Sequence, residues 1–353
     1  MTEYPLTFLA GPDALSRIQR EGLHPDMITA ITAAAGGPKW LVVSGLDRAL
    51  FPTWFEGRQQ PLLLIGSSSG AWRMVCASQA NPLAAITRFE AAYTYQRYPE
   101  IPPPHEISRQ SRHIVSEVLG DSGIQEIFEH PYMRLHLLVV RSRGLTQFEH
   151  KIPQSIGLGG AAAANLISRR SLGLFFERVL FSHPKQDPPL DLPGFPFHNY
   201  ALTADNFKDA VVASGSIPVI MSGVRDIAGA IPGVYRDGGV IDYHIDVALP
   251  GNGIVLFPHY VSHLTPGWLD KKLTWRKPEY SRNTLLVAPS KAFVESLPLK
   301  KIPDRDDFYL FEGRDEARWD YWQAVSQASS QLGEAFLEAV TSGKIRKLVQ
   351  PLY

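Results

Sequence analysis

Apolar residues gather in short runs, and the first two runs are each followed by a turn of small residues and a helical pattern. Residues 28–35 are apolar and β-branched at their start, which predicts a strand. Gly36-Gly37 interrupts this run, and apolar side chains then recur near helical spacing over 39–51. The run 61–66, a serine-rich turn and a second helical pattern repeat the order. Two consecutive strand–turn–helix units favour a parallel sheet covered by helices.

Further apolar patterns predict more elements of the same kind. Strands are predicted at Met133–Ser142, Tyr200–Leu202, Ile254–Phe257 and Thr284–Ala288, and helices at Pro82 to about Tyr98, Ile107–Leu119, Gly157–Arg170, Phe207–Ser214 and Arg314–Val340. Residues 172–181 fit a strand or a helix, and the five prolines of 184–196 predict a loop. A core strand and its connecting loop fit these two segments best. No repeat or domain boundary is visible, so we predict one α/β domain over 1–353, with a mostly parallel sheet and helices on both faces.

Composition excludes several classes of function. Lys plus Arg and Asp plus Glu are 35 each, so the chain has no electrostatic footprint for nucleic acid. Cys76 is the one cysteine, which rules out an intrachain disulfide and suggests a buried thiol. The first twelve residues lack the pattern of a signal peptide, and no apolar run is long enough to span a membrane. We therefore expect a soluble cytoplasmic protein.

The turn after the second predicted strand carries the strongest chemical signal. Residues 66–70 read Gly-Ser-Ser-Ser-Gly, the G-x-S-x-G layout of a nucleophile elbow. Gly66 and Gly70 flank Ser68 because the turn is tight and a Cβ would collide with neighbouring backbone. Ser68 would expose its Oγ at the end of the sheet, and it needs a partner that takes its proton.

Two other glycine-rich turns suit the same chemistry. Gly36 and Gly37 end the first strand and open a helix, so their N–H groups could hold an oxyanion, with the Ser69 N–H as a third candidate. Lys39 could hold this turn by bonding carbonyls, which we favour, or could add its charge to the anion site. Asp237 precedes Gly238 and Gly239, which together predict an open turn where the carboxylate can approach another backbone closely.

In this order, the three turns resemble those of the patatin-like phospholipase family: Gly-Gly-x-Lys, G-x-S-x-G and Asp-Gly-Gly. The segment 213–218, Ala-Ser-Gly-Ser-Ile-Pro, is similar to the family's Ala-Ser-x-x-x-Pro stretch. The likeness covers about 28–245 in blocks, and 246–353 is expected to be an extension that packs on this core.

The resemblance implies a three-layer patatin-like fold and a catalytic dyad. Ser68 would be the nucleophile, and Asp237 the base that takes its proton directly. The expected reaction is hydrolysis of an ester bond in a fatty acyl lipid, of phospholipase or lysophospholipase type, through an acyl-enzyme. No cofactor, metal or nucleic-acid partner is implied. The expected partner is an acyl lipid or small ester, with peripheral contact to a membrane.

Other interpretations stay open at this stage. Asp237 and His259 follow Ser68 in the order of a Ser-His-Asp esterase, although the early Gly-Gly turn fits a dyad better. His259 and His263 have a helical metal-ligand spacing, but no supporting carboxylate pattern surrounds them. The same fold could also serve a protein that binds acyl lipids without cleaving them.

Overall fold

A computed structural model describes residues 3–98, 102–186 and 190–353 of the protein. The strands are β1 Leu6–Ala10, β2 Ile28–Ala33, β3 Leu62–Ser67, β4 Met133–Ser142, β5 Phe176–Ser182, β6 Phe197–Ala201, β7 Val224–Arg225, β8 Val234–Asp237, β9 Ile254–Pro258, β10 Thr284–Pro289 and β11 Val349–Pro351. The helices are α1 Pro12–Glu21, α2 Ser44–Ala49, α3 Ser69–Ala77, α4 Pro82–Thr94, α5 Pro104–Leu119, α6 Gly123–Glu129, α7 Lys151–Ile167, α8 Phe207–Ser214, α9 Lys291–Ser296, α10 Asp307–Leu310, α11 Asp315–Ala328, α12 Ser330–Thr341 and α13 Ile345–Leu348.

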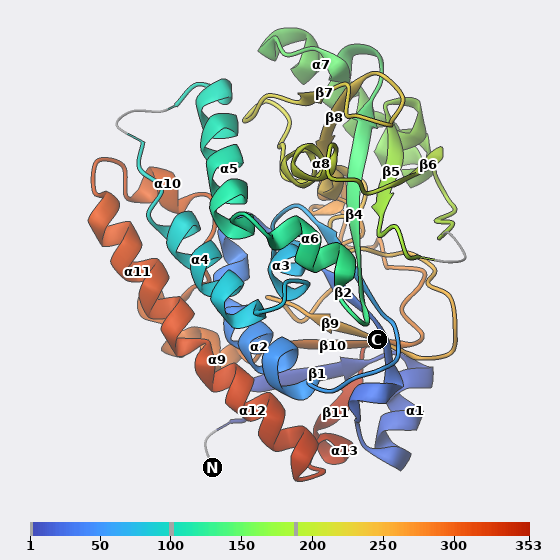
Figure 1. Cartoon of the computed structure of the whole chain (residues 1–353), viewed down its shortest axis with the longest axis vertical. Helices are drawn as coiled ribbons and strands as arrows, with labels where there is room; N and C mark the ends of the chain where they lie inside the picture. Colours follow the sequence, from blue (N-terminus) through green and yellow to red (C-terminus); the bar gives the residue numbers. More distant parts are fainter. Residues whose placement is uncertain (1–2, 99–101, 187–189) are drawn as a thin grey trace.

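One mixed, mostly parallel sheet forms the centre of the molecule (Figure 1). Its strands follow the order β11-β1-β10-β9-β2-β3-β4-β5-β6, with β8 paired to β4 and β7 paired to β8. Parallel pairs join β10, β9, β2, β3 and β4 in turn, while β5 and β8 are antiparallel to β4. The α/β class predicted from the strand–turn–helix pattern is confirmed.

Most predicted strands and helices form close to their predicted limits, and three helical predictions need correction. The helix predicted over 157–170 is α7, which already begins at Lys151 and ends at Ile167. The pattern over 39–51 begins as a 3₁₀ helix, Gly37–Val42, before α2. The pattern over 314–340 is two helices, α11 and α12, which meet at Ser329. The Ser329 hydroxyl accepts a hydrogen bond from the N–H of Gly45 (2.9 Å), so this junction is where the C-terminal helices meet α2.

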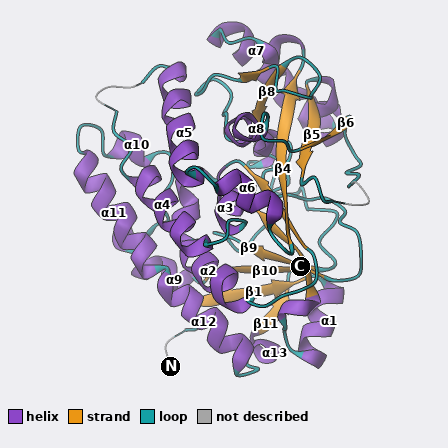
Figure 2. Ribbon diagram, in the orientation of Figure 1, coloured by secondary structure: helices purple, strands orange, loops and turns teal. Residues whose placement is uncertain are grey.

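The two faces of the sheet are covered differently (Figure 2). Leu62 and Leu64 of β3 point into the large core formed with helices α2 to α5 and α8. The alternate residues, including Ile65 and Leu138, pack mainly against extended segments, through Leu190, Leu192, Ile245 and Val247. Farther along β4, Val140 packs with Ala161 of α7, so helices lie on both faces but unevenly. Residues 187–189 of the predicted proline-rich loop lie outside the described residues.

The C-terminal part of the chain supplies strands to the same sheet as the motifs. β9 pairs with β2, β10 follows β9, and β11 lies beside β1. α12 packs so closely on α2 that a Cβ on Gly333 would lie 2.4 Å from the carbonyl oxygen of Gly45. The segment from 246 onward therefore packs against both β2 and α2, the strand before the first glycine turn and the helix after it.

Two features of the described residues bear on the expected partners. Over 3–98, 102–186 and 190–353, no helix is both long and apolar enough to cross a bilayer. The same residues contain no group of three or more His, Cys, Asp or Glu side chains arranged to hold a metal ion.

Candidate active site

Ser68 occupies a strained turn where β3 leads directly into α3. Its backbone has φ 56° and ψ −130°, a conformation that L-residues with a side chain rarely adopt. The flanking glycines are required by close packing, since a Cβ on Gly66 would lie 2.4 Å from Ala71 Cα. A Cβ on Gly70 would lie 2.0 Å from the carbonyl oxygen of Ala33. The turn is thus built as the G-x-S-x-G pattern predicts.

The strand register brings Asp237 to this turn. Along one edge of β4, Leu138 pairs with Ser67 at the end of β3, and the next residue, Val139, pairs with Asp237 at the end of β8. Because β8 runs antiparallel to β4 and β3 runs parallel to it, the two strands approach each other end to end. Gly238 fits the junction because it lacks a side chain: a Cβ there would lie 2.3 Å from the Leu138 carbonyl oxygen.

Ser68 and Asp237 are in direct hydrogen-bond contact. The Ser68 hydroxyl donates to Asp237 Oδ2 at 2.7 Å, and the N–H of Gly239 donates to Oδ1 at 2.7 Å. Both side chains are buried, with residue exposures of 6% and 7%. Burial raises the pKa of Asp237 to about 6, although both hydrogen bonds and the charges of Arg305 and Lys271 act to lower it. The carboxylate is therefore a stronger base than an exposed aspartate.

The segment 213–218 holds both members of this pair. The Ser214 hydroxyl accepts from the Ser68 N–H at 3.0 Å and donates to a β4 carbonyl at 2.7 Å. The carbonyl of Ser216 accepts from the Asp237 N–H at 3.0 Å. These bonds fix the nucleophile turn and the end of β8 to one frame.

Three backbone N–H groups close to Ser68 in the site have no hydrogen-bond acceptor among the described residues. Gly36 and Gly37 line the same small recess as Ser68 and Asp237. Among the described residues, no acceptor is bonded to the N–H of Gly36 or Gly37. Ser69 is the first residue of α3, so its N–H has no acceptor within that helix. The site therefore contains unsatisfied donors beside the nucleophile.

The Gly-Gly turn is held from the C-terminal part of the chain. The Ala35 N–H donates to the Tyr243 carbonyl at 2.9 Å, and the Tyr260 hydroxyl donates to the Ala35 carbonyl at 2.5 Å. The Tyr260 ring covers Gly36, where a Cβ would lie 2.7 Å from a ring carbon. Lys39 Nζ lies 5.1 Å from the centre of this ring and forms no hydrogen bond within the described part of the chain. Its charge thus faces the site without bonding the turn's carbonyls.

The histidines near the site have structural partners. His244 Nε2 lies 2.9 Å from the Tyr260 hydroxyl. His259 Nδ1 lies 2.7 Å from the carbonyl oxygen and 3.0 Å from the backbone nitrogen of Val261, and burial lowers the pKa of His259 to about 3. Asp242 forms a buried bidentate pair with Arg178, at 2.7 and 2.8 Å. No histidine is among the described residues that line the cavity around Ser68.

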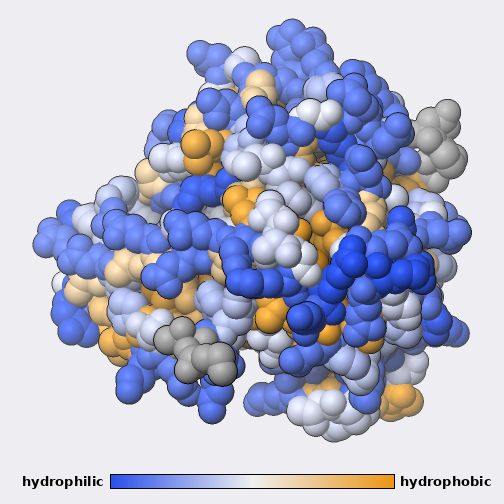
Figure 3. Space-filling model, turned by 90° about the horizontal axis from the view of Figure 1, so that it is seen from below, coloured by the Kyte–Doolittle hydropathy of each residue, from blue (hydrophilic) through white to orange (hydrophobic). Residues whose placement is uncertain are grey.

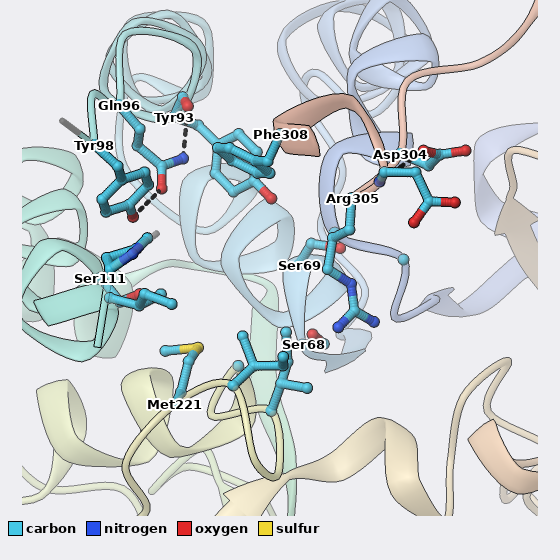
Figure 4. A pocket seen from close by; sticks show the side chains of 18 of the residues that line it. Ser68, Ser69, Tyr93, Gln96, Tyr98, Ser111, Met221, Asp304, Arg305 and Phe308 are labelled. Carbon is cyan, nitrogen blue, oxygen red and sulfur yellow. Dashed lines mark hydrogen bonds between the residues drawn. The ribbon is translucent and has the colours of Figure 1, made fainter. Parts of the chain in front are cut away.

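Ser68 opens into a cavity of about 640 Å³ (Figure 4). This volume lies within the usual range for small-molecule sites, about 300–1,000 Å³. Figure 4 shows Ser68, Ser69 and Arg305 on one side of the space and Tyr98 and Ser111 on the other. Much of the wall between them is apolar or aromatic, including Trp72, Tyr93, Ile107, Ile114, Ile217, Met221 and Phe308.

Several residues of this site carry no motif that sequence reasoning could find. Arg305 lines the recess, and a Cβ on Gly37 would lie 3.4 Å from its Cγ. Its guanidinium has no hydrogen bond or ion pair with any residue that the structure describes. Lys271 and Trp268 also line the cavity, and burial lowers the pKa of Lys271 to about 8. All three residues lie in the segment after 246, where the sequence contains no motif that predicts a functional site.

No known protein-family model matches the chain, and a search of curated protein sequences returns no match.

Proposed function

We propose that this protein is a serine hydrolase of the patatin-like type, with a Ser68–Asp237 dyad that cleaves carboxylic ester bonds of fatty acyl lipids. The observation that carries the proposal is the 2.7 Å bond from the Ser68 hydroxyl to a buried carboxylate. A base must lie within hydrogen-bond reach of the proton that it removes, and Asp237 does. The proposal includes a three-layer patatin-like arrangement of the α/β fold.

In the first half of the reaction, Asp237 accepts the Ser68 proton as Oγ attacks the ester carbonyl. The carbonyl oxygen becomes an oxyanion, which the N–H groups of Gly36, Gly37 and Ser69 stabilise. One such donor is worth roughly 3–4 kcal/mol in known acyl-transfer sites. Asp237 then gives its proton to the leaving alcohol as the carbon–oxygen bond breaks, and an acyl-Ser68 ester remains.

In the second half, water replaces the alcohol. Asp237 accepts a proton from the water as its oxygen attacks the acyl carbonyl, and the same donors hold the second oxyanion. Ser68 leaves with the proton that Asp237 returns, and the product is a carboxylic acid. Burial of Asp237 supports this cycle, because a raised pKa suits a group that both accepts and returns a proton.

The cavity supports an acyl substrate and the site supports a dyad. Its apolar and aromatic lining suits a hydrocarbon chain, while donors and charged groups gather around Ser68. Ser68 contacts Asp237 without an intervening ring, and His259 is bonded elsewhere. These contacts favour direct proton transfer to Asp237 over a Ser-His-Asp triad.

Hydrolysis of a short-chain acyl ester tests the proposal. We expect Ser68→Ala to lower kcat by roughly 10⁴-fold or more, as in other serine hydrolases. His259→Ala should keep activity close to that of the unmodified protein, and circular dichroism should check that both variants fold. An inactive but natively folded His259→Ala protein would contradict the dyad.

A further inference from the structure

The exposed face of α7 is unusually apolar for a surface helix. Ile152, Ile156, Leu166 and Ile167 are 66%, 60%, 60% and 90% exposed. No charged residue occurs anywhere from 152 to 168. A 17-residue helix is about 25 Å long, so this uncharged face extends along a large part of one end of the molecule.

Two neighbouring 3₁₀ segments widen this face. Leu145 and Phe148 lie at the segment before α7, and Leu174 ends the segment after it, with exposures of 44%, 47% and 71%. Both segments pack against α7. We call the seven exposed side chains the α7 surface: Leu145, Phe148, Ile152, Ile156, Leu166, Ile167 and Leu174. Apolar patches of this kind on a soluble protein usually mark a binding surface.

The charges between residues 150 and 176 are all positive. Residues 150–176 contain no Asp or Glu, in a chain whose formal net charge is zero. Lys151 and Arg170 are exposed and have no ion pair among the described residues. The bordering acids are already neutralised, since Glu149 pairs with an arginine at 3.0 Å and Glu177 with another at 2.7 Å. This combination complements an anionic, apolar partner.

The N-terminal end of α7, next to the α7 surface, lies beside the cavity that holds Ser68. Lys151 lines the cavity, and Gln154 of α7 accepts a hydrogen bond from the N–H of Val219, another lining residue, at 2.7 Å. The next lining residue, Ile220, is 40% exposed. In Figure 1, α7 lies at the top of the molecule, and residues of α5 also line the cavity. The opposite face, seen in Figure 3, is mainly hydrophilic with apolar side chains between the polar ones.

We propose that the α7 surface docks the protein on an anionic lipid surface, with the cavity that Lys151 lines beside the docked helix. A lipid surface fits better than a protein partner because an apolar face with basic ends matches both layers of such a membrane, the acyl region and the anionic headgroups. Docking there would let an acyl chain pass into the cavity without crossing water. The identity of the docked lipid as a substrate rests on the proposed function; the docking itself does not.

Vesicle co-sedimentation of the full-length Ser68→Ala protein tests docking without turnover. We expect binding to vesicles of phosphatidylcholine with phosphatidylserine and at least about tenfold weaker binding to phosphatidylcholine alone. Ile152→Glu/Ile156→Glu should weaken the binding by at least about tenfold, because it puts two acids into the docked face. Leu83→Glu, at a 46% exposed site on α4, is the matched control and should bind as before.

Three outcomes would overturn the proposal: no sedimentation with the anionic vesicles, equal binding by the double variant, or equal binding to both vesicle types. Light scattering gives a fourth outcome that would overturn it. If the protein is a dimer and the double substitution dissociates it, a second copy of the chain, not a lipid surface, covers the α7 surface. Thermal unfolding of the variants excludes misfolding as the cause of lost binding.

Activity measurements separate this proposal from the proposed function. With Ser68 present, the double variant should hydrolyse a water-soluble short-chain ester at the unmodified rate and vesicle-borne esters at least about tenfold more slowly. A protein that docks but hydrolyses neither ester would overturn the hydrolase function and support docking. Equal loss of both activities in a folded variant would contradict docking as the role of α7.

Discussion

At the residue scale, the site combines a strained serine with a carboxylate that is costly to ionise. Ser68 is held at φ 56°, and Asp237 is buried at the end of a strand. Neither feature improves folding, since strain and desolvation both oppose the native state. Such features cluster at functional sites because a pre-placed nucleophile and a stronger base serve chemistry.

The raised pKa of Asp237 predicts the acid limb of the pH profile. Only the ionised form of Asp237 can accept the Ser68 proton, and this form is lost as the pH drops through its pKa of about 6. We therefore expect kcat/KM to fall over the same pH range. The positive charge of Arg305 lowers this pKa, so Arg305→Met should move the limb to higher pH. Arg109→Met, at an exposed side chain outside the cavity lining, is the control. An unmoved limb in Arg305→Met would refute this electrostatic role.

At the element scale, the site depends on where strands end. Ser67 and Asp237 pair with consecutive residues of β4, so a shift of β8 by one residue would turn the carboxylate to the other face of the sheet. The helix that follows Ser68, α3, is joined to α2 by a buried ion pair. Arg73 of α3 donates two hydrogen bonds to the carboxylate of Asp47 in α2, both at 2.7 Å.

This pair makes a stability prediction. Asp47→Ala should lower the free energy of unfolding by about 3–5 kcal/mol, because it leaves the Arg73 charge buried without a partner. Asp47→Ala/Arg73→Met should be more stable than the single variant, since no unpaired charge remains. Urea unfolding measures both. A double variant less stable than Asp47→Ala would show that the ion pair is not the reason for the loss.

The two glycine-containing turns of the site could be predicted from the sequence, whereas the strand β8 and the position of Arg305 could not. The elbow at Ser68 and the turn at Gly36-Gly37 were predictable, because local backbone geometry restricts such positions to small residues. The strand β8 was not predicted: its four residues, Val234–Asp237, are too short for a periodic signal. Arg305 was out of reach as well, since only tertiary packing brings it beside Gly37.

At the scale of the whole molecule, the N- and C-terminal parts of the chain interleave in one sheet. β9 and β10 separate β2 from β1, so neither the motif-bearing part nor the segment after 246 has a complete set of strand neighbours alone. The Gly-Gly turn is likewise held by Tyr260 of the later segment. The candidate active site and the C-terminal segment should therefore be stable only together.

This interleaving predicts one cooperative unfolding transition. Far-ultraviolet circular dichroism, tryptophan fluorescence and ester hydrolysis should lose half of their native signal at the same urea concentration. Trp40 belongs to the motif-bearing part and Trp322 to the segment after 246. Both are buried in the same core, so the fluorescence of each should change when its part unfolds. A fluorescence transition well separated from the loss of circular dichroism would indicate independently folding units.

Covalent labelling of Ser68 tests the central claim most directly. A fluorophosphonate reacts with an activated serine, so peptide mapping of the treated protein should place the adduct on Ser68. Asp237→Asn keeps the size of the side chain but removes the base, and it should slow labelling by at least about 10²-fold. Failure to label Ser68, or an Asp237→Asn protein labelled as fast as the unmodified one, would contradict the Ser68–Asp237 dyad.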